Sequence, residues 1–146
     1  MSTADSSAPA ALDAALLALR PPVAAELPAE PAATTADFLH RTLRPLLKLQ
    51  NPRLLAVTAD FLLDHHVPFR VAGPAEQQRL LAELLTRNVK LRYTIVGLVT
   101  GLFTAAEMRF YRSQRAEVNR RLLELAVRRV QDQASAVAAL LAASDA

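Results

Sequence analysis

The sequence has 146 residues, of which 52% are hydrophobic and 5% aromatic, with no cysteine and a net charge of +3. This length suits one domain with its own core, and the absence of cysteine excludes disulfides, thiolate metal sites and thiol nucleophiles. Asp5 and Asp13 interrupt the pattern of a secretory leader, and no uncharged apolar run reaches the roughly 20 residues that span a bilayer. We therefore expect a soluble cytoplasmic protein.

The beginning of the chain differs from the rest in charge. Residues 1–37 hold five acids against the single base Arg20, whereas residues 38–132 hold 16 Lys and Arg against eight acids. We expect residues 1–33 to form a flexible acidic arm, with helical periodicity only over Ala10–Leu19 and a proline-rich linker after it. The arm either folds back to screen the basic body or serves as a tether.

The helical domain is predicted to cover residues 34–133. Apolar residues recur at helical spacing over residues 38–50, where Pro45 predicts a kink or a restart of the helix. Further helices follow over residues 52–65 and from Pro74 onward, each opening with a proline at its first helical position.

The most apolar segment spans residues 89–102. It has almost no polar face, which predicts a helix at the centre of the bundle. It contains Gly97 and Gly101, a pair spaced by four residues that would let another backbone approach closely. Two interpretations stay open, an intramolecular helix crossing and a homodimer seam.

Thr104 and Glu107 give the clearest local signal, a capping box that opens a helix. From there we expect one long helix toward Leu141, with the alanine-rich residues 134–146 fraying at its end. No segment shows the alternation of a β-strand. The sequence therefore predicts an all-α fold, an irregular bundle of five to six helices with a long C-terminal helix.

Arginines crowd the C-terminal half and, with neighbouring bases, would make an anion-binding surface. Glu117 and Glu124, however, precede Arg121 and Arg128 by four residues, a spacing typical of an ordinary solvated helix face. Both interpretations stay open. The candidate anion-binding residues are Arg87, Lys90, Arg92, Arg109, Arg112, Arg120, Arg121 and Arg128.

His40, Asp60 and Asp64 come nearest to a set of metal ligands. The two aspartates lie one helical turn apart, but nothing in the sequence brings the distant histidine to them. The sequence has no nucleophile elbow, phosphate-binding loop or dinucleotide fingerprint. We therefore assign no metal-binding, catalytic or cofactor-binding residue and expect no cofactor.

Several segments resemble a family of small bacterial all-helical proteins, some of which carry the name glyoxalase. The resemblance covers roughly residues 38–133 and is carried by Thr42–Asn51, Gly97–Glu107, Asn119–Arg121 and Arg129–Gln133. It implies an all-helical fold and, through the name, a lactoylglutathione lyase-type activity. No residue of this sequence matches a glyoxalase motif, so the resemblance assigns no site residue.

These features favour a non-enzymatic helical interaction or regulatory module whose partner is another protein or a second copy of the chain. A nucleic-acid-binding or other polyanion-binding protein is the first alternative. A glyoxalase-like or other metal-dependent enzyme is the second. None of the three requires insertion into a membrane.

Overall fold

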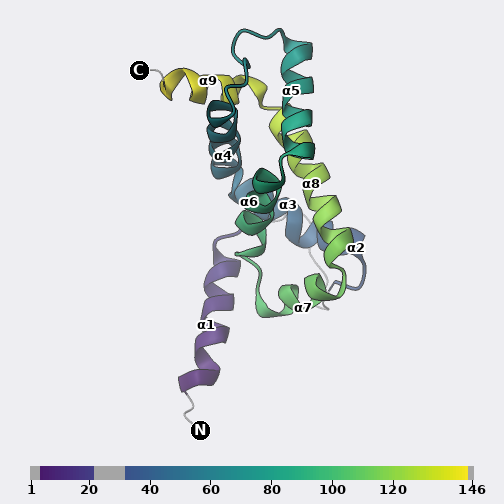
Figure 1. Ribbon diagram of the computed structural model, residues 1–146. Helices are drawn as coiled ribbons and strands as arrows, with labels where there is room; N and C mark the ends of the chain where they lie inside the picture. Colours follow the sequence, from purple (N-terminus) through teal and green to yellow (C-terminus); the bar gives the residue numbers. More distant parts are fainter. Residues whose placement is uncertain (1–3, 22–31, 145–146) are drawn as a thin grey trace.

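The computed structural model describes residues 4–21 and 32–144, and every regular element in these two segments is a helix. Figure 1 shows how the helices are arranged. The predicted all-α class is confirmed. The described segments contain eight helices when one continuous but irregular helix is counted once, so the expected number of five to six was too low.

The arm contains a longer helix than its sequence pattern indicated. Helix α1 spans Ala4–Ala18 and includes Pro9, whereas the pattern predicted Ala10–Leu19. Figure 1 shows α1 extending away from the other helices. Residues 1–3 and 22–31, which include most of the expected linker, lie outside the described residues.

The irregular helix consists of α2 (Thr35–Phe38), the π-helical turn η1 (Leu39–Leu43) and α3 (Arg44–Leu49). The side chain of Thr34 caps its start by accepting the amide hydrogen of Asp37. Pro45 has no amide hydrogen and its ring crowds the preceding turn, so the chain widens there by one residue. The kink or restart expected at Pro45 takes this form.

The next three helices are α4 (Asn51–Asp64), α5 (Pro74–Arg87) and α6 (Val89–Thr100). Proline stands in the first turn of α4 and of α5, as predicted, because that position needs no amide donor. Asn88 caps α6 by accepting the amide hydrogen of Leu91 at 2.9 Å.

The predicted long C-terminal helix is wrong, because the chain breaks twice to form α7 (Ala105–Ser113), α8 (Arg115–Gln131) and α9 (Ala134–Ser144). At the first break, Gln114 leaves helical geometry with φ −134°. This bend lets Phe110 of α7 stack on Phe38 while the Tyr111 hydroxyl donates to Asn119 of α8 at 2.8 Å.

The second break turns α9 against α4. Asn51 and Gln133 exchange side-chain amide hydrogen bonds of 2.7 and 2.8 Å at this corner. Val137 and Leu141 of α9 are buried in the core. The alanine-rich segment is therefore a packed helix over its described length rather than a frayed end, because these two side chains give it an apolar face to bury.

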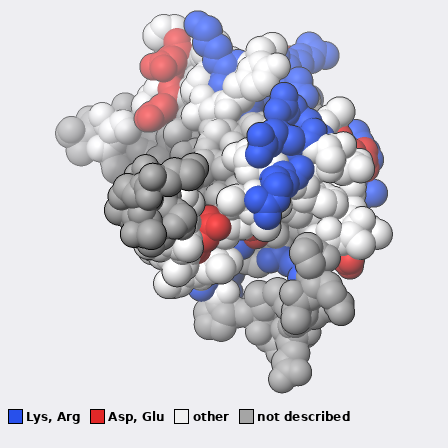
Figure 2. Space-filling model, turned by 90° about the horizontal axis from the view of Figure 1, so that it is seen from below, with Lys and Arg blue, Asp and Glu red and all other residues white. Residues whose placement is uncertain are grey.

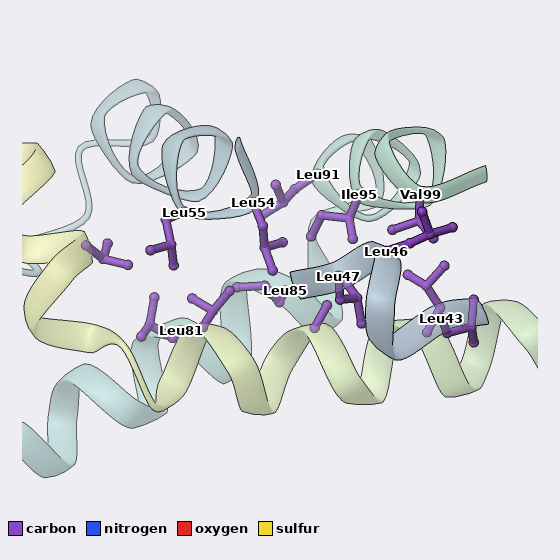
Figure 3. Packing of buried hydrophobic residues seen from close by; sticks show 14 of the residues in the cluster. Leu43, Leu46, Leu47, Leu54, Leu55, Leu81, Leu85, Leu91, Ile95 and Val99 are labelled. Carbon is purple, nitrogen blue, oxygen red and sulfur yellow. The ribbon is translucent and has the colours of Figure 1, made fainter. Parts of the chain in front are cut away.

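The core lies around α8, not around α6 as the apolar pattern predicted. Helix α8 contacts η1 and all of α4, α5, α6, α7 and α9, and it buries an apolar residue in every turn. Figure 3 shows aliphatic side chains of the surrounding helices meeting above and beside it. The labelled side chains are Leu43, Leu46, Leu47, Leu54, Leu55, Leu81, Leu85, Leu91, Ile95 and Val99.

Candidate interaction surface

The glycine pair of α6 lies on the outside of the bundle. A Cβ added to Gly97 would meet no atom within 4 Å, and one added to Gly101 would meet only the carbonyl oxygen of Gly97. Both residues are exposed. These positions do not favour the interpretation as an intramolecular helix crossing, because no described atom of another element lies within 4 Å of either added Cβ.

Large apolar side chains continue the outer face of α6. Tyr93 is 71% exposed and Val89 is 58% exposed. They precede Gly97 at spacings of four residues, so all three lie along one side of the helix. Helix α6 therefore buries only Leu91, Ile95 and Val99 in the core and presents an apolar stripe outward.

This stripe borders a groove between α5, α6 and α8. Two adjoining hollows of about 530 and 210 Å³ share Arg92, Asn119 and Leu123 in their walls. We call them together the α5–α6–α8 groove. Its apolar lining residues are Leu85, Val89, Tyr93, Val96, Ala116, Leu123 and Val127.

The rim of the groove is basic. Arg92, Arg120 and Arg128 line it together with a single acid, Glu124, which gives a net charge of +2. Arg120 bridges Glu117 and Glu124, in both cases at 2.7 Å. Hydrogen bonding to Arg120 lowers the pKa of Glu117 against the opposing effect of burial. Arg92 and Arg128 have no carboxylate partner within the described segments.

The other predicted anion-binding residues divide into two groups. Arg87 and Arg121 lie near Glu83 and Glu117, at 3.6 and 3.2 Å, and so belong to ordinary helix-surface ion pairs. Lys90, Arg109 and Arg112 are exposed and have no carboxylate partner in the part of the chain that the structure describes. Figure 2 shows Lys and Arg side chains gathered in a band on the lower face of the molecule.

One further basic hollow was not predicted from the sequence. It has a volume of about 420 Å³ and lies between α3 and α8, where Arg44, Arg128 and Arg129 accompany Asp132. Arg44 and Arg128 are more than 80 positions apart in the sequence, so no local pattern could have joined them.

The main attachment of α1 to the body is made by Arg20, two residues after the helix, and centres on one carboxylate. The guanidinium of Arg20 donates to both oxygens of Glu107 at 2.5 and 2.6 Å, and also to the carbonyl oxygen of Leu102 at 3.1 Å. Thr42 of η1 donates to the same carboxylate at 2.9 Å. The Thr104 amide donates to it as well, which completes the predicted capping box.

The Arg20–Glu107 anchor is largely buried, with side-chain exposures of 9% and 15%. Burial alone would raise the pKa of Glu107, but the hydrogen bonds from Arg20 and from the Thr104 amide outweigh it and hold that pKa below its ordinary value. The buried Nε of Arg20 has no hydrogen-bond partner among the described residues, and this cost reduces the net stability of the anchor.

The rest of α1 is held loosely. Asp13 accepts the amide hydrogen of Ala105 at 3.1 Å. Leu12, Leu17 and Leu19 are each more than half exposed. The leucines of α1 and of the turn after it are therefore exposed, and the contacts that hold this segment to the body are mainly polar.

His40, Asp60 and Asp64 do not converge. His40 lies on η1 and the aspartates lie on α4, and all three are exposed. Over residues 4–21 and 32–144, no three side chains of the metal-binding types are placed to share an ion. His65 instead stacks on Phe61 and contacts Asn88 at 3.2 Å.

We compared the chain with known protein families, curated proteins and solved structures. No family model, curated protein or solved structure matches the chain. Each helix in the described segments is also too short or too polar to cross a bilayer.

Proposed function

We propose that this protein is a non-enzymatic helical interaction module that self-associates through the α5–α6–α8 groove. The observation that carries the proposal is the exposure of Tyr93 and Val89 beside an apolar hollow of about 530 Å³. Contiguous apolar surface of this kind, rimmed by polar residues, is typical of protein-binding sites.

The shape and charge of the groove suit a helical ligand. An amphipathic helix binds by laying its apolar face into a hydrophobic groove. The side chains that line this groove come from three helices that the core holds in place, so little ordering is needed when a ligand binds. Because Gly97 and Gly101 have no side chain, such a ligand could approach the backbone of α6 closely.

Self-association is tested by sedimentation analysis over a roughly hundredfold range of concentration. We expect the mean mass to rise with concentration and Tyr93→Glu to weaken association roughly tenfold or more, because it places a charge in the apolar contact. Thr94→Glu puts the same charge on an exposed site of α6 outside the groove and should change little. The mass of a single chain at every concentration would overturn the proposal.

Polyanion binding is a second candidate function, supported by the exposed bases that lack carboxylate partners. Labelled single-stranded DNA is the probe, and affinity is followed by fluorescence anisotropy across a salt series. We expect the slope of log Kd against log salt to fall by about two when Arg109→Gln and Arg112→Gln are combined. Arg79→Gln is the matched control, since Arg79 is paired with Glu76 and Glu83. A flat salt response contradicts this function.

A further inference from the structure

We propose that the occupant of the α5–α6–α8 groove is helix α1 of a second copy of this chain. This inference rests on the proposed self-association and names the segment that performs it. The groove presents an open apolar surface, and the described residues of the arm include three exposed leucines.

Charge and length match between the two parts. Asp5 and Asp13 are the only charged residues in the sequence of α1, and Asp13 also accepts the Ala105 amide of its own chain. The helix is therefore acidic, whereas the residues that line the groove are net basic. At 1.5 Å per residue, the 15 residues of α1 extend about 22 Å. The wall of the groove on α8, from Ala116 to Gln131, extends about the same distance.

The exposed leucines in and just after α1 lie where they can contact a second molecule. Asp13, Leu16 and Arg20 lie on the side that faces the body, and all three are half-buried. Leu12 and Leu19 lie beside them on the open flank and are exposed. A helix of this length is marginal in water without an apolar contact, so a partner surface would stabilise it.

Helix α1 does not fill the groove of its own chain. No described residue of α1 lines the groove. Arg20 donates to the carbonyl of Leu102, just beyond the C-terminal end of α6, whereas the α6 residues that line the groove run from Val89 to Val96. Along the helix axis, Leu102 lies about 9 Å from the nearest of these residues and about 20 Å from the farthest, and Figure 1 shows α1 pointing away from the bundle.

An exchange of α1 between two copies would cover the groove and the exposed leucines of both chains. In a two-fold dimer, each α1 enters the groove of the other molecule, and the same contact is made twice. The Arg20–Glu107 anchor then fixes the direction in which the arm leaves the body. The interface combines leucine burial with attraction between an acidic helix and a basic rim, so it should weaken as salt increases.

Cross-linking tests the exchange directly, because the natural chain has no cysteine. A Leu12→Cys copy is mixed with a mass-tagged Ala116→Cys copy under mild oxidation. Ala116 lines the groove and is exposed. We expect a mixed disulfide between the two chains. The control pair, Leu12→Cys with Ala136→Cys, uses an exposed alanine on α9 outside the groove and should give at least roughly tenfold less product.

A pair of substitutions on α1 distinguishes the exchange of α1 from self-association through the groove by some other contact. Leu12→Glu should weaken association roughly tenfold, whereas Ala11→Glu, exposed on another face of α1, should not. Suppose that Tyr93→Glu disrupts the dimer, that Leu12→Glu leaves it intact, and that the mixed disulfide does not form. Self-association through the groove would then stand, and the proposed exchange of α1 would be wrong. If no dimer forms at any concentration, both proposals fail.

Discussion

At the scale of single residues, Glu107 has two structural roles. It closes the capping box of α7 through the Thr104 amide, and it binds Arg20, which attaches α1. Thr42 adds a third donor from η1. One carboxylate therefore joins three segments, and its ionisation decides whether the arm is held.

Acid should release α1 from the body. The folded-state pKa of Glu107 is lowered, so the anchor contributes stability above the ordinary value of about 4.5 and loses it as pH falls through the folded value. We expect amide hydrogen exchange in α1 to accelerate roughly tenfold or more below that pH, while α8 stays protected.

The same release should occur at neutral pH in Glu107→Gln, because a neutral amide cannot compensate the charge of the buried guanidinium of Arg20. Glu124→Gln removes an exposed carboxylate of α8 and is the control. Equal exchange rates for α1 in both variants would show that Glu107 does not hold the arm.

At the scale of elements, α6 has two unlike faces. Its inner face is fully packed, whereas its outer face contains two glycines and exposed apolar side chains. Glycine inside a helix costs up to about 1 kcal/mol relative to alanine. The structure of one chain offers no packing contact that offsets this cost at Gly97.

Gly97→Ala should therefore raise the free energy of unfolding by about 0.5–1 kcal/mol, since the new methyl group meets open space. Gly101→Ala is the comparison, because its Cβ would lie 2.9 Å from the carbonyl oxygen of Gly97 and should gain less. Urea unfolding at low protein concentration gives both values. Lower stability of Gly97→Ala than of the natural chain would contradict the absence of a close intramolecular contact.

At the scale of the whole molecule, local patterns predicted the elements better than their arrangement. The capping box at Thr104 and Glu107 was found because both partners lie within one turn. The breaks at Gln114 and Gln133 were missed, since they depend on contacts with distant residues such as Phe38 and Asn51. Tertiary contacts of this kind leave no periodic signal.

The surface was predicted less completely than the helices. The charge asymmetry between arm and body was visible in composition, but the Arg20–Glu107 pair joins residues 87 positions apart. Likewise, the apolar excess of residues 89–102 was interpreted as a sign of burial, although Tyr93 and Val89 are exposed. Hydrophobicity alone does not distinguish a core from an interface.

The widened turn at η1 sets the rotation between the two ends of its helix. Phe38 before it packs on Phe110, and Leu46 after it is buried in the core. Removing one residue here would leave an ordinary α-helix and would shift the side chains of the widened turn relative to their present partners. Thr42 would then face away from Glu107. Evolution of this chain should therefore tolerate changes of residue type between Phe38 and Leu46 far more readily than changes in the number of residues.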